Sequence, residues 1–207
     1  MAQITKKDLM DFEDEIAALF CDAKIRAPIH LSDGNEDQLI EIFRSISRDD
    51  WVFSTWRSHY HALLHGISKE WLKAEIMAGN SITINNPERH FFSSALVGGI
   101  CPIAVGVAMG LKMNGSKNKV WVFIGDMTAE TGTFHECLKY SQNHDLSINF
   151  VIEDNGKSVG TPTRTVWGEK ELEMSNSHVE QMAPNLYRYA YIKSKYPHVG
   201  AGKWVKF

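Results

Sequence analysis

The stretch Lys119-Val-Trp-Val-Phe-Ile-Gly-Asp126, followed further on by Ile148-Asn-Phe-Val-Ile-Glu-Asp-Asn-Gly156, decides the fold of this chain. Two short runs of β-branched and aromatic residues, 119–124 and 148–152, predict buried strands. The intervening stretch from Thr131 to Asn143 mixes polar and apolar residues and predicts a helix. A strand–helix–strand unit of this length is typical of parallel pairing. We therefore expect an α/β fold, a three-layer sandwich with a mostly parallel sheet.

Two polar residues directly follow the predicted strands. Asp126 comes after the first strand and Asn155 after the second. Because ligands of an open parallel sheet bind outside the carboxyl ends of its strands, we expect both side chains to face one crevice. Carboxylate and amide oxygens suit Mg²⁺, which also keeps phosphate oxygens in its shell. The alternative is that both are ordinary turn residues, which Asp and Asn favour.

The spacing of these residues resembles the thiamine diphosphate motif of a known enzyme family. Gly125-Asp126 is followed 29 positions later by Asn155, which ends Glu153-Asp154-Asn155. The family's Gly-x-Phe-x-Glu helix start is matched by Gly132-Thr-Phe-His-Glu136, and its Ser-Thr-Pro by Gly160-Thr-Pro162. The pattern is similar to alpha subunits of the first component of 2-oxo acid dehydrogenases. Amino-terminal halves of transketolases share the domain.

Upstream segments extend the resemblance. Trp56-Arg57-Ser58-His59 resembles the family's aromatic-Arg-x-His, and 95–108 resembles its Gly-Ile-Val-Gly…Pro-x-Ala-x-Gly-x-Ala segment. Leu31-Ser-Asp-Gly-Asn-Glu36 is similar to the family's Gly-Gln-Glu near the amino end.

The resemblance implies a role for each matched position. Arg57 would bind the diphosphate, His59 would face the thiazolium as the catalytic residue, and the backbone at Ala95 and Val97 would touch the aminopyrimidine. Mg²⁺ would be held by Asp126, Asn155 and the Lys157 carbonyl. The implied cofactor-binding positions are Trp56, Arg57, Ala95, Val97, Gly125, Asp126, Met127, Thr128 and Asn155.

Three departures from the family pattern leave a non-catalytic homologue open. Met127 replaces the last glycine of Gly-Asp-Gly, where a positive φ would be costly. Asp154 replaces the first Asn of Asn-Asn and adds negative charge. Residues 85–90 stand in place of the family's Gly-Gly-Ser-Met-His loop.

The resemblance implies the cofactor-anchoring subunit of an enzyme that acts on a 2-oxo acid with thiamine diphosphate and Mg²⁺. In the family, the glutamate that activates the cofactor belongs to a separate pyrimidine-binding domain. We therefore expect a beta-like partner subunit carrying that domain, in a heterotetramer or a homodimer-based assembly. The alternative enzyme is a transketolase-type ketol transferase. The sequence does not specify the substrate.

Length and composition set the remaining bounds. The 207 residues predict a single domain over 1–207. A net charge of −3 with mixed signs gives no nucleic-acid footprint. Three cysteines without metal spacing indicate reduced thiols. Because no signal peptide or membrane span is evident, we expect a cytoplasmic protein that does not bind membranes.

Periodicity and turn signals complete the expected layout. We expect a strand over 51–54, a polar loop over 80–94, a buried glycine-bearing helix over 97–113 and an extended aromatic tail over 166–207. The segments 97–110 and 187–207 are candidate docking surfaces for a partner. Four further helices are expected over 6–27, 36–46, 59–65 and 69–78.

Two other kinds of ligand site fit the sequence less well. His59, His61 and His65 suggest zinc, but zinc sites need further ligands with clear spacing. A Rossmann site requires Gly-x-Gly-x-x-Gly after a first strand, which glycines 98, 99, 106 and 110 do not provide.

Overall fold

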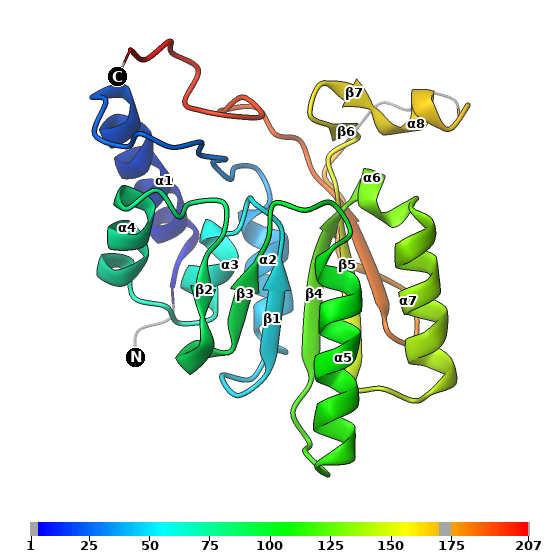
Figure 1. The fold of residues 1–207 in the computed structure, drawn as a ribbon. Helices are drawn as coiled ribbons and strands as arrows, with labels where there is room; N and C mark the ends of the chain where they lie inside the picture. Colours follow the sequence, from blue (N-terminus) through cyan, green and yellow to red (C-terminus); the bar gives the residue numbers. More distant parts are fainter. Residues whose placement is uncertain (1–3, 170–174, 207) are drawn as a thin grey trace.

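The chain is organised around one sheet of seven strands, in the order β2-β3-β1-β4-β5-β9-β8 (Figure 1). In this computed structural model, residues 4–169 and 175–206 are described. The four central pairings, β3–β1, β1–β4, β4–β5 and β5–β9, are parallel, whereas the outer strands β2 and β8 run antiparallel. The expected mostly parallel α/β sheet is confirmed. The strands are β1 (Trp51–Ser54), β2 (Asn85–Asn86), β3 (Phe91–Ser93), β4 (Val120–Gly125), β5 (Ile148–Asp154), β8 (Glu180–Ala183) and β9 (Leu186–Ala190).

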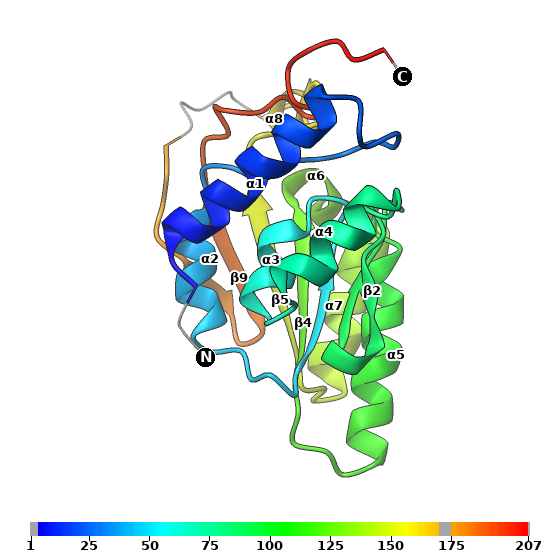
Figure 2. The ribbon, with the colours of Figure 1, turned by 90° about the vertical axis from the view of Figure 1, so that its left-hand side faces the viewer.

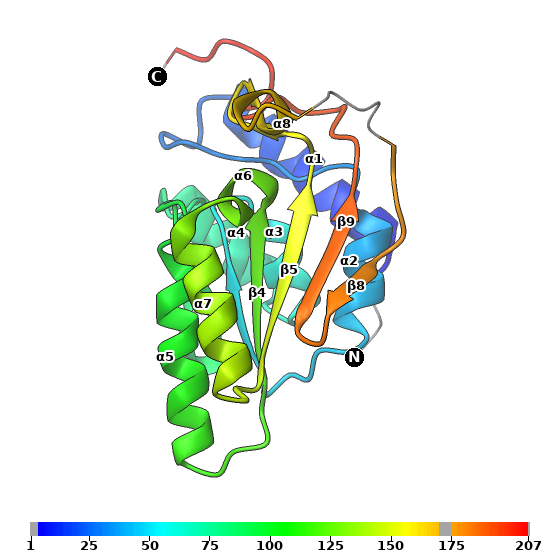
Figure 3. The same ribbon diagram turned by 90° about the vertical axis from the view of Figure 1, so that its right-hand side faces the viewer.

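Helices cover both faces of the sheet, which makes three layers. Figure 2 shows α1, α3 and α4 in front of the strands, and Figure 3 shows α5 and α7 covering the opposite face. A small hairpin, β6 (Lys157–Ser158) and β7 (Thr161–Pro162), with α8 (Thr163–Val166), stands beyond the end of β5. The other helices are α1 (Lys6–Cys21), α2 (Glu36–Phe43), α3 (His59–Leu64), α4 (Lys69–Met77), a 3-10 turn (Pro87–Arg89), α5 (Ile100–Met113), α6 (Asp126–Ala129) and α7 (Gly132–Asn143).

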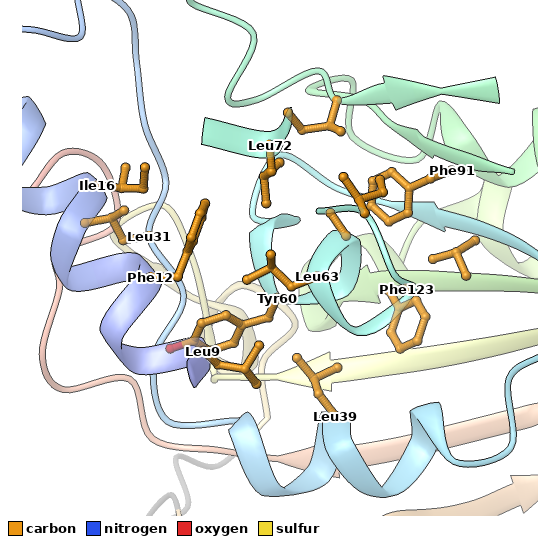
Figure 4. Packing of buried hydrophobic residues seen from close by; sticks show 14 of the residues in the cluster. Leu9, Phe12, Ile16, Leu31, Leu39, Tyr60, Leu63, Leu72, Phe91 and Phe123 are labelled. Atoms are coloured by element: carbon orange, nitrogen blue, oxygen red, sulfur yellow. The ribbon is translucent and has the colours of Figure 1, made fainter. Parts of the chain in front are cut away.

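The core is split by the sheet because neighbouring strand residues point to opposite faces. In β4, Trp121 and Phe123 pack with the α1–α4 layer, while Val120, Val122 and Ile124 pack with the α5–α7 layer. Figure 4 shows Leu63, Phe91 and Phe123 among the buried side chains of the first of these clusters. The strand sequence is apolar throughout because both of its faces are buried.

All of the expected helices exist, and the first four end earlier than expected. The helix expected over 6–27 ends at Cys21, because the backbone turns at Ala23, which has a φ of 57°. Thr5 caps the start of this helix: it accepts from the Asp8 N–H, and Asp8 reaches back to Thr5. No helix of the described residues is long and apolar enough to cross a bilayer.

The expectation of a loop over 80–94 is wrong in part. Phe91 pairs with Val52, so β3 lies beside β1 inside the parallel sheet, and Asn85–Asn86 pairs with β3 at its edge. These strands are only three and two residues long. A segment that short shows no alternation of polar and apolar residues, so its strand conformation depends on pairing with the neighbouring strand.

The tail expected to be extended contains strands. Residues 180–183 and 186–190 form a hairpin, and β9 pairs with β5 along Phe150–Asp154. Tyr189 and Tyr191 are buried, so this part of the tail is not a docking surface. Residues 170–174 of the expected tail lie outside the described residues.

The helix expected over 97–113 begins at Ile100, and it is buried on one side only. Ile100, Cys101, Ala104, Val105 and Ala108 face the core. The opposite side is exposed and apolar, and it carries two glycines with open space around them. Its exposed members, with the turn before the helix, are Leu96, Val97, Ile103, Met109 and Met113.

Candidate cofactor site at the carboxyl ends of the strands

A small cavity lies where β1, β4 and β5 end. Its volume is about 40 Å³. Segments far apart in the sequence meet there because parallel strands bring their carboxyl ends to one edge. The lining residues are Asn35, Thr55, Trp56, Arg57, Gly125, Asp126, Met127, Thr128, Glu153, Asn155, Lys157, Ser158, Val159, Tyr191 and His198.

Asp126 is the most unusual group in the cavity. It is the first residue of α6, directly after β4, and only 4 % of it is exposed. Its Oδ2 has no hydrogen-bond partner among the described residues. Burial raises the pKa of this carboxyl to about 6. A buried carboxylate oxygen without a partner is costly unless a cation or a donor occupies the space beside it.

Asn155 and Lys157 approach Asp126 from the end of β5. The Lys157 N–H donates to Asn155 Oδ1 at 3.1 Å, and Asn155 Nδ2 donates to the Tyr191 hydroxyl at 3.3 Å. An amide oxygen has two lone pairs, so Asn155 can accept this bond and still bind a cation. The Lys157 side chain is exposed, which fits a role for its backbone carbonyl alone.

Trp56 and Arg57 line the cavity from the end of β1, as expected. Arg57 Nε donates to the Leu31 carbonyl and its Nη2 to the His198 carbonyl, both at 3.2 Å. Two carbonyl contacts do not exhaust the five N–H donors of a guanidinium. The Trp56 Nε1–H is buried and has no partner among the described residues. Both side chains therefore retain donors for an anionic ligand.

The structure accounts for Asp154, the charged residue in the family's first Asn position. It is 2 % exposed and points to the opposite face of β5 from Asn155. Its Oδ2 accepts from Arg164 Nη2 at 3.1 Å and from Arg188 Nη2 at 2.5 Å, and its Oδ1 accepts from the Gly156 N–H at 2.9 Å. Two guanidinium groups thus compensate the added negative charge. We call this set the Asp154 clamp.

A second departure, Met127, is accommodated within α6. Its φ is not among the positive values found along the described chain. The cost expected for a methionine in place of glycine therefore does not arise, and Gly125, Met127 and Thr128 line the cavity together.

The structure does not bring His59 to the cavity. Its ring is fully buried, with Nδ1 at 2.9 Å from Glu13 Oε2 and Nε2 at 3.0 Å from Ser81 Oγ. Because both ring nitrogens are used inside the α1–α4 layer, this histidine serves the fold. A role facing the thiazolium has no support in this arrangement.

The three histidines also do not form a zinc site. His61 Nε2 lies 3.3 Å from Glu153, whereas His59 contacts Glu13 and the His65 ring packs against Phe91 and Phe43, so the three rings share no carboxylate. Within residues 4–169 and 175–206, no cluster of three or more His, Cys, Asp or Glu side chains is arranged to hold a metal.

Ala95 and Val97 lie on the exposed turn between β3 and α5. This turn is at the same edge of the sheet, since β3 runs parallel to β1. Neither residue lines the cavity. Their contact with an aminopyrimidine stays a prediction.

Sequence reasoning missed a buried network beneath the cavity. Glu153 Oε1 accepts from Tyr189 at 2.5 Å and from Asn35 Nδ2 at 3.0 Å, and His61 lies 3.3 Å away without meeting hydrogen-bond geometry. Burial alone would raise the pKa of Glu153, but His61, Tyr189 and Arg57 outweigh it and hold the pKa below its usual value. Asn35 and Glu153 belong to segments that resemble family motifs, and this is the feature of the sequence that could have indicated the network.

A wider recess opens outward from the cavity. It has a volume of about 420 Å³ and shares Arg57, Asn155, Lys157, Val159, Tyr191 and His198 with the cavity. Tyr191 and His198 come from the stretch after β9, where no local motif indicated a site. Lys193 and Tyr196 add a cation and a phenol to the recess.

The site combines two hard oxygen groups and an arginine at the carboxyl edge of a parallel sheet. That arrangement is typical of α/β proteins that bind a phosphorylated ligand through a divalent cation. A family model described as the dehydrogenase E1 component matches residues 5–174. The chain belongs to this family.

Curated relatives agree with the family. The alpha subunit of acetoin:2,6-dichlorophenolindophenol oxidoreductase from Bacillus subtilis is 29% identical over 75% of this chain and 50% of its own length. Pyruvate dehydrogenase E1 component subunit alpha from Rickettsia prowazekii is 27% identical over 74% of this chain and 50% of that protein. The chain spans about half the length of these relatives.

Among solved structures, one described as a thiamin diphosphate-dependent enzyme from Mycobacterium smegmatis matches at 20% identity, with a TM-score of 0.44. The match covers 64% of this chain and 22% of that one. The fold assignment rests on the strand order and not on this partial match.

Proposed function

We propose that this chain is the cofactor-anchoring subunit of an enzyme that uses thiamine diphosphate and Mg²⁺ to act on a 2-oxo acid. The observation that carries the proposal is the meeting of Asp126, Asn155 and Arg57 around one cavity at the carboxyl edge of the sheet. These residues are distant in sequence and are the ones that the family motif relates to metal and diphosphate.

The residues present fit such a cofactor. Mg²⁺ would be held by the unpartnered oxygen of Asp126, by the Asn155 amide oxygen and by the Lys157 carbonyl. A dication beside Asp126 would offset the burial that raises the pKa of its carboxyl. Arg57 would bind phosphate oxygens, for which its planar paired donors are suited.

When bound, thiamine diphosphate supplies a carbanion that adds to a carbonyl and then accepts electrons. The residues of this chain hold and orient it. Asp126 and Asn155 fix the metal, Arg57 fixes the diphosphate, and the buried carboxylate of Glu153 with its two donors keeps the floor of the cavity rigid.

Two of the three departures from the family pattern, Asp154 and Met127, do not favour a non-catalytic homologue. The Asp154 clamp neutralises the added charge, and Met127 lies in an unstrained helical turn. Both replacements leave the metal-facing groups in place.

A partner subunit is part of the proposal. The two relatives named above are alpha subunits, and in such enzymes the activating glutamate lies on a pyrimidine-binding domain. The exposed apolar side of α5, with Ile103, Met109 and Met113, is the surface of this chain that fits a docking role. A beta-like subunit placed there would also reach the turn at Ala95 and Val97, which precedes the helix at the carboxyl edge of the sheet.

Steady-state assays of the chain with and without candidate beta-like subunits test this function. We expect thiamine diphosphate-dependent oxidation of 2-oxo acids such as pyruvate, with dichlorophenolindophenol as electron acceptor, only when a partner is present. Robust turnover by the isolated chain would contradict the need for a partner. Ketol transfer between sugars without 2-oxo acid oxidation would place the enzyme in the transketolase class instead.

A further inference from the structure

The segment Lys193–Gly200 lies beyond the residues that the family model matches. After β9 the chain crosses above the carboxyl edge of the sheet, as the red segment of Figure 1 shows. Asp33 holds it: the Ser194 and Lys195 N–H groups both donate to Asp33 Oδ2 at 2.7 Å, and Lys193 pairs with Asp33 Oδ1. Lys195 and Tyr196 also contact Asp14. The segment is therefore fixed at its start.

Its other end is fixed as well. The Gly200 N–H donates to the Ile29 carbonyl at 2.8 Å. The His198 carbonyl accepts from Arg57 Nη2 at 3.2 Å and lies 2.7 Å from His30 Nδ1. Because a carbonyl can only accept, His30 must carry its proton on Nδ1. The His198 backbone therefore helps to set the position of Arg57.

The His198 imidazole is held against the cavity by ring packing. It meets His30 edge to face, with ring centroids 4.9 Å apart, and Trp56 at 6.3 Å. Its ring nitrogens make no hydrogen bond to the described residues, and the ring is half-buried. Burial, Arg57 and Lys193 all lower the pKa of His198, so the imidazole is neutral near pH 7 and offers one N–H donor.

The inner cavity and the outer recess adjoin, because both are lined by Arg57, Asn155, Lys157, Val159, Tyr191 and His198. A diphosphate group bound to Arg57 and to a cation beside Asp126 would therefore lie at the boundary of the two spaces. His198 lines both spaces, which places it at the junction that such a ligand crosses.

We propose that Lys193–Gly200 is a wall of the cofactor site and that His198 is its ligand-contacting residue, donating a hydrogen bond from its imidazole to an anionic oxygen of the bound diphosphate. This inference rests on the proposed function and assigns a residue that neither the family match nor the motif identifies.

The charges around His198 favour an anion. Arg57, Lys157 and Lys193 line the same recess, and Asp33 is already engaged by Lys193 and two backbone N–H groups. Two carboxylates lie on the inner side of the cavity. In the proposed arrangement Asp126 binds Mg²⁺, and Glu153 already accepts hydrogen bonds from Asn35 and Tyr189. An anionic oxygen between Arg57 and His198 would meet donors on both sides.

Imidazole NMR spectra of the full-length chain test the proposal. The His198 ring signals, assigned by their loss in His198→Ala, should shift when thiamine diphosphate and Mg²⁺ are added, while those of the exposed His178 should not. By calorimetry, His198→Ala should weaken thiamine diphosphate about 10-fold, the effect of losing one hydrogen bond to a charged group. Thiamine, which lacks the diphosphate, should bind both proteins alike.

His178→Ala is the matched control and should bind thiamine diphosphate like the wild type. Asp33→Asn, which loosens the start of the segment without touching the cavity, should also weaken the diphosphate more than thiamine. Wild-type binding with unmoved His198 signals and unchanged affinity in His198→Ala would overturn this inference alone. Failure of the wild type to bind thiamine diphosphate would overturn the proposed function together with it.

Discussion

The two halves of the candidate site differ in how the sequence encodes them. At the ends of β4 and β5, Asp126 and Asn155 follow their strands within a few residues, and the motif is local. On the opposite wall, Tyr191 and His198 reach the cavity only because β9 pairs with β5 and the following segment is held by Asp33. Local spacing therefore reveals the first wall, whereas the second depends on contacts between distant parts of the chain.

The two walls are held in place by different kinds of interaction. The first wall is positioned by strands that are buried on both faces. The second is positioned by polar contacts that bridge more than 150 residues of sequence, such as Lys193 with Asp33. The Asp154 clamp links the two, because Asp154 ends β5 and Arg188 belongs to β9. Each prediction below separates one wall from the other.

The largest effect is expected from Tyr189→Ala, which tests whether β9 belongs to the core. Tyr189 is 1 % exposed, and its hydroxyl donates to Glu153. Truncating a buried aromatic side chain should lower the free energy of unfolding by about 3–5 kcal/mol. Urea denaturation measures this change. Tyr140→Ala, at a position 40 % exposed, is the control and should cost less than about 1 kcal/mol. Equal costs would place β9 outside the core.

Asp126→Ala tests the first wall alone. Losing a carboxylate from the metal shell should weaken thiamine diphosphate binding in Mg²⁺ about 100-fold, since even outer-shell losses cost about 10–100-fold. Calorimetric titration measures the affinity. Asp11→Ala, on the exposed side of α1, should leave it unchanged. The metal assignment fails if Asp126→Ala binds as tightly as the wild type.

Arg57→Lys tests a residue that lines the cavity with Asp126 and Asn155 and also binds the His198 carbonyl of the second wall. Lysine keeps the charge and loses the planar fork, so thiamine diphosphate should bind about 10-fold more weakly while thiamine changes little. Competition titrations with the two ligands give the ratio. If both ligands weaken alike, Arg57 acts on the fold, through its bonds to Leu31 and His198.

Arg188→Gln tests the link between the walls. Arg164 would still pair with Asp154, and Arg188 is 38% exposed, so the loss of stability should be about 1 kcal/mol. The cost should shrink in an Asp154→Asn background, because the charge that Arg188 compensates is then gone. An unchanged cost in that background, again by urea denaturation, would show that Arg188 acts independently of Asp154.

Much of the fold follows from the sequence because the central strands are apolar runs that can be recognised from their own residues. The runs at 51–54, 119–124 and 148–152 correspond to β1, β4 and β5, and the helix expected from Thr131 to Asn143 corresponds to α7. Strands β3 and β9 are not predicted from the sequence. Each lies between two other strands of the sheet, and the pairing of Phe91–Ser93 with β1 and of Leu186–Ala190 with β5 orders them.

The site shows the same division. Trp56, Arg57, Asp126 and Asn155 meet at the cavity as the motif predicts. His59 does not line the cavity, because a motif position does not state which way a ring points; Glu13 and Ser81 hold the ring inside the α1–α4 layer. No local sequence pattern identifies His198 as a site residue, because its position depends on the path of the chain after β9.

Calorimetry of the wild-type chain with thiamine diphosphate, in Mg²⁺ and after treatment with EDTA, tests the central claim most directly. If both walls form one metal-dependent diphosphate site, the chain should bind one equivalent of thiamine diphosphate in Mg²⁺ and lose most of that affinity in EDTA. Equal affinity in both conditions, or no binding in Mg²⁺, would contradict the account.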